Sequence, residues 1–595
     1  MRLIEDYALV GDLHTAALVG RDGSIDWCCL PRFDSDACLA AILGTAEHGR
    51  WQLGPTAKVR RRSRGYRPET LVLESTVVTG SGSVRVIDFM PPRRERPHIV
   101  RLVEGLSGRV AMRSELLVRP DFGRIVPWVR EVDEHTVTAI AGPDAVGLRS
   151  TVRLERTDGT AIASNFTVTE GDRVPFVLAW FPSHEDPPAE IDPWAALEET
   201  EAYWCEWASR CTHHGIYRDE VIHSLIVLKA LTYAPTGGIA AAATTSLPEQ
   251  IGGSRNWDYR FCWLRDATQT LLAMLDSGYQ EEATVWRHWL LRAVAGDPTD
   301  VQIMYGLAGE RRLDERELEW LPGFEGSRPV RVGNAASTQL QLDTYGELVD
   351  ALYETEIAGA PSDDAVWELV KRFLSWLEEG WRQKDAGIWE VRGELRHFTH
   401  SKVMAWVAFD RGVRFCEECG HSGDVERWRQ IRDEIHAEVL QHGFSEAKQS
   451  FTQAFDSEEL DASLLQMPLV GFLPATDPRV VSTVAAIRRE LEVGGLLLRY
   501  RTDPGLESDG LPAGEGVFLA CSFWLVSVLA LQGQIFDAHE LFNNLLDLRS
   551  DIGLLAEEYD PAEGRQLGNF PQALTHLALV DAALILDRQT ERFNP

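Results

Sequence analysis

Two different hydrophobic periodicities divide the chain. Before residue 185 or so, apolar positions alternate with polar ones or form short β-branched runs, as in residues 83–89 and 166–169. Groups rich in Gly, Pro and Asp separate these runs, for example at residues 156–159. Short strands spaced by such turns are typical of antiparallel sandwiches. Residues 1–190 are therefore predicted to form an N-terminal antiparallel β-sandwich.

A polar, Pro-rich stretch, SHEDPPAE at residues 183–190, ends the strand-like region. An amphipathic pattern over residues 193–211 then indicates a single helix. We therefore assign residues 191–217 to a helical linker and residues 218–595 to a separate helical domain.

Helical periodicity continues from residue 218 to the end of the chain. It predicts twelve helices, at residues 218–234, 261–277, 279–295, 334–356, 362–381, 400–417, 423–442, 461–468, 477–493, 516–532, 534–549 and 571–588.

These helices alternate in character. The odd members of the series are rich in charge, whereas the even members are apolar over most of their circumference, as in residues 517–526. A helix that is apolar all round is enclosed by protein, and an amphipathic helix keeps a solvent face. Loops from odd to even helices run to roughly 17–38 residues, longer than ordinary helix–helix connections. The predicted fold class is thus multidomain β + α, a sandwich followed by an (α/α)6 barrel whose long loops share one end.

Composition narrows the range of partners. The 59 Lys and Arg and 91 Asp and Glu give a formal charge of −32, and 44% of residues are hydrophobic. This apolar content is typical of a globular chain. A surface this negative repels phosphate backbones and anionic lipid, so we expect neither nucleic acid nor a membrane as partner. The longest apolar run, residues 517–531, is too short to span a bilayer.

The N-terminus and the cysteines bear on location. MRLIEDYALVG has no basic region followed by an apolar one, so we expect no secretory signal. Nine cysteines, an odd number, are typical of reduced thiols. We therefore expect a cytoplasmic protein; the sequence does not choose between a monomer and a homo-oligomer.

The long loops contain the candidate chemistry. Residues 252–266 read GGSRNWDYRFCWLRD and place two Trp, a Tyr, three Arg and two Asp beside an inner helix. Residues 387–392 read GIWEVR, residues 555–560 read LAEEYD, and residues 499–501 add RYR. A cavity lined by Trp, Arg and carboxylates suits an uncharged polyhydroxyl ligand, since the charged groups bind hydroxyls through charge-assisted hydrogen bonds. No Walker A, G-x-G-x-x-G, H-E-x-x-H or EF-hand pattern occurs, so we expect no cofactor and no metal.

These motifs resemble glycoside hydrolase family 15, which contains glucoamylases, glucodextranases and bacterial-type α,α-trehalases. The matching segments are 252–266, the Trp389–Glu390 pair and AEEYD at 556–560. Near the N-terminus, IEDYALVGD at 4–12 and DGSIDW at 22–27 resemble the trehalase-like N-terminal domain of its bacterial members.

The resemblance implies roles for individual residues. Glu390 would be the general acid and Glu557 the general base, although a shifted register would give the second role to Glu558. The implied sugar-binding residues are Arg265, Asp266, Tyr259, Trp263, Trp257, Trp389, Arg499 and Glu558. The leaving-group side is expected in loops 296–333 and 444–460.

The resemblance also implies an inverting, exo-acting hydrolase that releases β-glucose from the non-reducing end of a small α-linked glucose disaccharide or oligosaccharide. Inverting enzymes place an acid and a base on opposite faces of the sugar, about 6.5–9.5 Å apart. The N-terminal resemblance favours trehalose as the substrate, with malto- or isomaltooligosaccharides as the alternative. An inverting disaccharide phosphorylase and a non-catalytic glucan-binding protein are the remaining alternatives.

Overall fold

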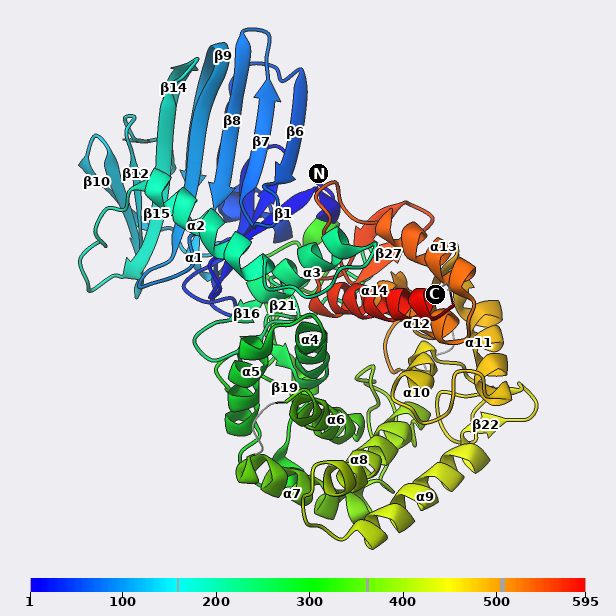
Figure 1. Cartoon of the computed structure of the whole chain (residues 1–595). Coiled ribbons are helices and arrows are strands. Elements are labelled where there is room, and N and C mark those ends of the chain that lie inside the picture. The colour runs from blue at the N-terminus through cyan, green and yellow to red at the C-terminus, as the bar shows by residue number, and fades with distance from the viewer. Residues whose placement is uncertain (1, 158–159, 360–362, 503–508, 594–595) are drawn as a thin grey trace.

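The computed structural model describes residues 2–593 apart from 158–159, 360–362 and 503–508. A β-rich N-terminal part stands against one side of a ring of helices (Figure 1). The predicted fold class, a sandwich followed by an (α/α)6 barrel, is confirmed.

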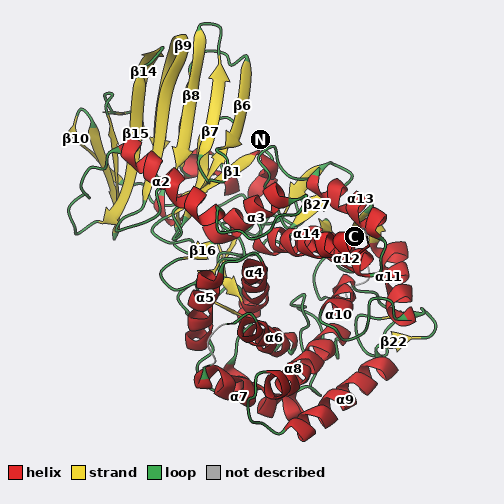
Figure 2. Ribbon diagram, viewed as in Figure 1, coloured by secondary structure: helices red, strands yellow, loops and turns green. Residues whose placement is uncertain are grey.

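The N-terminal strands, drawn in yellow in Figure 2, form one 15-stranded antiparallel network that divides into two sheets along a long shared strand. Their strands are β1 (Tyr7–Gly11), β2 (Ala16–Gly20), β3 (Ser24–Cys29), β4 (Ala37–Leu39), β5 (Arg50–Pro55), β6 (Arg61–Tyr66), β7 (Leu73–Val78), β8 (Gly82–Phe89), β9 (His98–Leu117), β10 (Trp128–Asp133), β11 (Thr136–Ala141), β12 (Asp144–Ser150), β13 (Glu155–Arg156), β14 (Ile162–Thr169) and β15 (Arg173–Pro182). A short helical turn, α1 (Pro120–Gly123), follows β9.

The shared strand is β9. Its first half pairs with β8 and β15, and its second half pairs with β5 and β14. Gly105 lies where the strand passes from one sheet to the other, and a Cβ there would stand 1.8 Å from the Thr169 carbonyl oxygen. Only glycine fits this approach of two backbones. Along β7, buried and half-buried side chains alternate, as expected for a strand with one face in the core.

Helix α2 (Pro193–Ala208) connects the sandwich to the barrel. Asp192 begins it, because its carboxylate accepts the backbone N–H groups of Trp194 and Ala195. Near its N-terminus, Leu197 packs among sandwich side chains. Near its C-terminus, Trp207 stacks on the barrel residue Tyr279 with ring centroids 4.2 Å apart. The linker helix therefore contributes side chains to both parts.

The barrel contains a counterpart for each of the twelve predicted helices. They are α3 (Arg218–Ala230), α4 (Leu264–Asp276), α5 (Gln280–Ala293), α6 (Asp343–Ile357), α7 (Asp364–Gly380), α8 (Thr399–Glu418), α9 (Val425–His442), α10 (Gln466–Leu469), α11 (Pro478–Leu491), α12 (Leu519–Leu531), α13 (Ile535–Leu546) and α14 (Ala573–Phe593).

The inner ring closes through contacts between α4 and α6, α6 and α8, α8 and α10, α10 and α12, α12 and α14, and finally α14 and α4. Burial follows the predicted alternation. In inner helix α12, residues 519–530 are all buried, whereas outer helix α9 buries only Trp428, Ile431, Ile435 and Val439. This spacing of three and four residues is the stripe of an amphipathic helix.

Short strands shape the loops between the helices. They are β16 (Thr232–Tyr233), β17 (Gly238–Ile239), β18 (Cys262–Trp263), β19 (Met304–Tyr305), β20 (Arg316–Glu317), β21 (Arg331–Val332), β22 (Phe444–Ser445), β23 (Ser450–Phe451), β24 (Glu492–Val493), β25 (Leu496–Leu497), β26 (Val517–Phe518), β27 (Glu558–Asp560) and β28 (Arg565–Leu567). Among the helices that the structure describes, we find none with the length and apolar character that a membrane crossing requires.

Candidate active site

A pocket lies where the long barrel loops meet. Its walls come from the segments that precede α4, α6 and α12, from the loop after α7, and from the connection between α13 and α14. The lining residues are Ala241, Glu249, Arg255, Trp257, Tyr259, Trp263, Arg265, Asp266, Asn334, Ile388, Trp389, Glu390, Arg392, Arg499, Leu511, Phe518, Glu557 and Gln572.

The structure brings together nine of the ten residues singled out from the sequence, because all of them except Glu558 line this pocket. Glu558 is fully buried and accepts a hydrogen bond from the Gly516 backbone N–H at 2.8 Å. It belongs to strand β27, where successive side chains point to opposite faces. Glu557 therefore opens to the pocket and Glu558 lies behind it, which differs from the sugar contact expected for Glu558.

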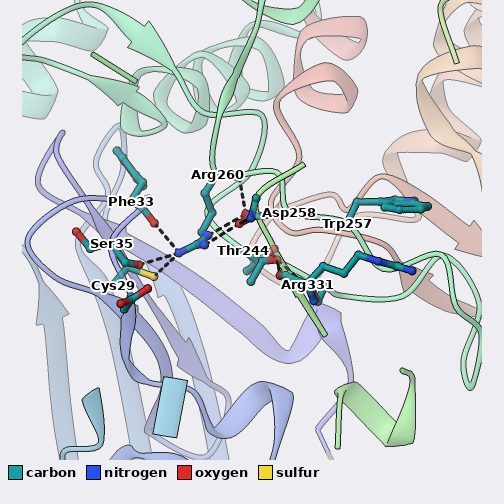
Figure 3. Close-up of polar contacts among 12 residues, drawn as sticks. Cys29, Phe33, Ser35, Thr244, Trp257, Asp258, Arg260 and Arg331 are labelled. Carbon is teal, nitrogen blue, oxygen red and sulfur yellow. Dashed lines mark hydrogen bonds and ion pairs between the residues drawn. The ribbon is translucent and has the colours of Figure 1, made fainter. Parts of the chain in front are cut away.

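An extended segment, residues 257–261, forms one wall of the pocket. Its backbone pairs with residues 241–246, as shown by hydrogen bonds from Ala242 N to Tyr259 O and from Ser246 N to Trp257 O. Side chains alternate along extended backbone. Trp257 and Tyr259 consequently line the pocket, whereas Asp258 and Arg260 do not. Figure 3 shows the Trp257 and Arg260 side chains pointing in opposite directions.

Two aromatic side chains orient the two candidate catalytic carboxylates. The Tyr259 hydroxyl donates to Glu557 Oε1 at 2.7 Å, and the Trp263 indole N–H donates to Glu390 Oε1 at 2.6 Å. The two rings meet edge to face, with centroids 5.2 Å apart. Each carboxylate thus accepts a hydrogen bond from one of two aromatic side chains that contact each other.

The loop that bears Glu390 is held in an uncommon conformation. Glu390 has φ of +58°, a region that costs free energy for residues other than glycine. The neighbouring Trp389 donates its indole N–H to both carboxylate oxygens of Asp461, at 2.9 and 3.1 Å. Arg265 adds a hydrogen bond to the carbonyl oxygen of Ile388 at 2.8 Å. These contacts fix the direction of the Glu390 side chain.

Arg265 and Asp266 stand at the start of inner helix α4. The Arg265 Nε donates to Asp266 Oδ1 at 2.7 Å, and both residues line the pocket. The paired charges leave further donors and acceptors of the two groups available to a polyhydroxyl ligand.

Arg499 lies at the centre of a buried acidic cluster that we define as Glu249, Glu515 and Glu558. Its Nη2 is 3.3 Å from Glu249 Oε2 and 3.9 Å from Glu558 Oε1, and it also donates to Glu515. Oxygens of the three glutamates lie within 4.8 Å of one another, a spacing that could hold a cation. The Arg499 guanidinium already supplies positive charge to this acidic cluster.

Burial governs the protonation of the site. Burial raises the pKa of Glu390, and the nearby Arg265 partly opposes that effect. Burial, with the charge of Glu249, raises the pKa of Glu557 to about 8, while the Tyr259 hydrogen bond lowers it. Burial also raises the pKa of Glu249 to about 7 and that of Glu558 well above its ordinary value. Glu249 and Glu558 therefore hold their protons to higher pH than ordinary glutamates do.

Sequence reasoning missed several polar residues of the pocket, namely Glu249, Arg255, Asn334, Arg392 and Gln572. Arg392 stacks over the Trp257 ring at 4.8 Å, as does Arg331 at 4.5 Å. Arg392 follows Glu390 by two residues, and that proximity to the GIWEVR motif was the available signal. Glu249 lies before the recognised motif, and the backbone pairing of 241–246 with 257–261 brings it to the pocket.

Two loops, 296–333 and 444–460, were expected to form the leaving-group side. None of the lining residues that the structure describes comes from 296–333 or 444–460. In the second loop, β22 and β23 pair as a hairpin, and Phe398 bridges to Ala454. This loop supports the start of α8, whereas Asn334, Arg392 and Leu511 reach the pocket.

Comparison with known proteins decides the family. The model for Glycosyl hydrolases family 15 matches residues 215–584, and the model for a trehalase-like N-terminal domain matches residues 2–188. The chain belongs to glycoside hydrolase family 15. It is therefore a glycoside hydrolase, as the motifs of its long loops had indicated.

Relatives in family 15 match over nearly the whole chain. A curated protein of Mycobacterium tuberculosis named Trehalase is 38% identical, covering 99% of this chain and 90% of its own length. A Trehalase of Thermoplasma volcanium is 34% identical, covering 99% and 95%. A crystal structure of a bacterial glucoamylase complexed with acarbose superposes with a TM-score of 0.73 at 12% identity, covering 99% of this chain and 96% of that one. This likeness shows the shared fold.

Proposed function

We propose that this family 15 chain is an inverting, exo-acting α,α-trehalase. Relatives named Trehalase, 34–38% identical over nearly their whole length, support trehalose as the substrate. The observation that supports the chemistry is the pair of carboxylates that line one pocket, each held by its own aromatic donor.

Glu390 is the proposed general acid and Glu557 the proposed general base. Cleavage of a glycoside passes through an oxocarbenium-like transition state. Glu390 protonates the oxygen that leaves, and Glu557 takes a proton from the water that attacks the opposite face of the ring. After each turnover Glu557 holds a proton and Glu390 lacks one, so both must exchange with solvent before the next. The raised pKa of Glu390 favours its starting protonated form.

Isotope labelling tests the stereochemistry. Trehalose hydrolysed in H₂¹⁸O gives one β-glucose with ¹⁸O at C1 and one unlabelled α-glucose, because the leaving half keeps its own C1–O bond. Proton NMR within the first minutes, with mass analysis, distinguishes the two halves. Labelled α-glucose as the initial product would contradict inversion.

Substitution of either carboxyl group tests the assignment. We expect Glu390→Gln and Glu557→Gln each to lower kcat by about 10²- to 10⁴-fold, the usual contribution of a positioned acid or base. Glu394→Gln is the matched control, because Glu394 lies exposed on the same loop. Near-normal turnover in either pocket variant would remove that residue from the mechanism.

A panel of α-linked glucosides tests the substrate. Release of glucose from maltose or isomaltose at a higher kcat/KM than from trehalose would favour the oligo-α-glucosidase alternative. Cleavage that requires phosphate and yields glucose 1-phosphate would identify a phosphorylase, which needs no carboxylate base. Sugar binding without any glucose release would leave a non-catalytic binding protein.

We also propose a cytoplasmic location. All nine cysteines are free thiols, and six of them are buried. Reduced thiols in this number are typical of the cytoplasm. Fractionation of cells with an antibody to the chain tests this placement, and sizing the purified chain would determine its oligomeric state.

A further inference from the structure

Arg260 lies directly behind the pocket wall. It follows Tyr259 in the extended segment 257–261, and its side chain points away from Trp257 toward Cys29, Phe33 and Ser35 of the N-terminal sandwich (Figure 3). The side chain has no exposed surface. A fully buried guanidinium costs a large desolvation free energy, so each of its donors needs a partner.

The Arg260 guanidinium divides its donors between the two parts of the molecule. Nε and Nη2 donate to the two carboxylate oxygens of Asp258, at 2.9 and 2.7 Å. Nη1 makes its contacts with the sandwich: the carbonyl oxygen of Ser35 at 2.7 Å, that of Phe33 at 3.5 Å, and the Cys29 sulfur at 3.6 Å. Burial raises the pKa of the Cys29 thiol to about 12, so these sandwich partners are uncharged.

Asp258 extends the same connection to a second pocket loop. Besides Arg260, its Oδ2 accepts the Gly333 backbone N–H at 3.0 Å, next to the pocket residue Asn334. The sandwich also reaches the strand that pairs with this segment, because the Trp27 indole donates to the Ala243 carbonyl at 2.7 Å. The pocket wall is thus held from behind by the sandwich.

We propose that Arg260 is a positioning residue of the active site: it fastens the strand that carries Trp257 and Tyr259 to the N-terminal sandwich, so that the sandwich sets where the Tyr259 hydroxyl stands against Glu557. This inference rests on the proposed role of Glu557 as the base. Tyr259 and Arg260 are adjacent on one extended backbone, so a displacement of the Arg260 guanidinium moves the neighbouring Tyr259 ring. The 2.7 Å hydrogen bond to Glu557 depends on the position of that ring.

The contacts require an arginine. Its planar fork binds the Asp258 carboxylate with two nitrogens while a third reaches the sandwich. A lysine keeps the charge and can pair with Asp258, but its single nitrogen has no fixed fork to hold both sides.

Three variants and a control test the proposal. Arg260→Lys keeps the buried charge pair. Arg260→Met combined with Asp258→Asn removes both charges together, which avoids leaving one of them buried and unpaired. Tyr259→Phe removes the hydroxyl through which Arg260 is proposed to act. Asp551→Asn is the matched control, because it breaks another ion pair between sandwich and barrel, Arg64 to Asp551 at 2.7 Å.

The measurements are kcat/KM, its pH profile and the Tm of the full-length enzyme, on whichever α-glucoside the wild type hydrolyses. We expect kcat/KM to fall about tenfold or more in Arg260→Lys and in the double variant, with the acidic limb displaced to higher pH. In the Tyr259→Phe background, Arg260→Lys should have much less effect, because coupled residues are not additive. The Asp551→Asn variant should keep wild-type kcat/KM.

Either folded Arg260 variant with wild-type kcat/KM and pH profile would overturn the proposal. Full additivity with Tyr259→Phe, or a failure of both Arg260 variants to fold, would do the same, because Arg260 would then act on stability alone. A wild type that hydrolyses none of the glucosides would instead defeat the proposed function, so the two failures are distinguishable.

Discussion

Two adjacent glutamates have very different surroundings. Glu557 lines the pocket and accepts a hydrogen bond from Tyr259, whereas Glu558 is buried behind it beside Arg499. Among the residues that the structure describes, Glu558 Oε1 has no hydrogen-bond partner. A carboxyl in such a place keeps its proton, and burial raises its pKa well above the ordinary value. The neutral form resembles glutamine in shape and polarity.

We therefore expect Glu558→Gln to keep kcat within about tenfold of the wild type, far above the residual activity of Glu557→Gln. The comparison is made on the same substrate at several pH values. If Glu558→Gln lowered kcat as much as Glu557→Gln does, the assignment of Glu557 rather than Glu558 as the base would no longer hold.

The pH dependence of kcat/KM is set by Glu557 and its neighbour Tyr259. Glu557 must be ionised to act as a base, and its pKa of about 8 lies above that of an ordinary glutamate. We expect the acidic limb of kcat/KM to rise through the neutral range rather than near 4.5. Tyr259→Phe should move this limb further up, because the Tyr259 hydroxyl lowers the pKa of Glu557. An acidic limb near 4.5, or one unmoved in Tyr259→Phe, would contradict this account.

At the scale of elements, the loop of Glu390 depends on the segment before α10. Asp461 accepts the Trp389 indole with both oxygens, and it also accepts the Gln453 side chain at 3.1 Å and the Ser463 backbone N–H at 2.8 Å. All of its partners are donors. An asparagine would place a donor against a donor in a buried site, at a cost of about 1–3 kcal/mol.

Asp461→Asn is thus expected to lower the free energy of unfolding by that amount and to reduce kcat, since Glu390 loses its fixed direction. Denaturant unfolding and steady-state kinetics measure the two effects. Asp477→Asn, at the start of α11, is the control for an Asp that caps a helix away from the pocket. If the two variants had the same kcat, Asp461 would have no role in orienting the loop that bears Glu390.

The elements themselves were largely predictable, and the walls of the pocket were not. Inner helices such as α12 are apolar all round, and outer helices such as α9 carry a single apolar stripe. The hydrophobic periodicity of the sequence therefore predicts a double ring of inner and outer helices. The pocket residues Glu249 and Arg255 lie in non-helical chain, where no period exists. Their place depends on pairing between residues 241–246 and 257–261, and on Arg255 binding the distant Asp509 at 2.6 Å. Glu558 does not line the pocket because neighbouring side chains around β27 point to opposite faces, a two-residue period that the sequence motif alone did not assign.

At the scale of the whole molecule, buried carboxyl groups link stability to pH. Burial raises the pKa of Asp343 and of Glu249 to about 7, and that of Glu557 to about 8. Their folded pKa values lie above the unfolded ones, so folded molecules bind more protons and stability falls as pH rises toward 8. The half-buried His14 and His223, whose pKa values desolvation lowers to about 4, oppose this only below about 6.5.

Between pH 6.5 and pH 8 the carboxyl groups act without that opposition. We expect the free energy of unfolding to fall by about 1–3 kcal/mol across this range, and Tm to fall with it. Thermal or denaturant unfolding at several pH values checks the slope, and Glu249→Gln should flatten it. A Tm that rises from pH 6.5 to pH 8 would show that these groups do not govern stability.

The closure of the ring by its last helix has a consequence for synthesis of the chain. Thr244, beside the pocket wall, bonds to Asn569, which is 325 residues further along. At about 5–20 residues per second, the ribosome adds that stretch in roughly 15–65 s. The sandwich and α4 have emerged by then, but α14, which packs on α4, has not. A nascent chain therefore waits with apolar inner helices uncovered, and the pocket is not complete until Glu557 and Gln572, near the end of the chain, have been made.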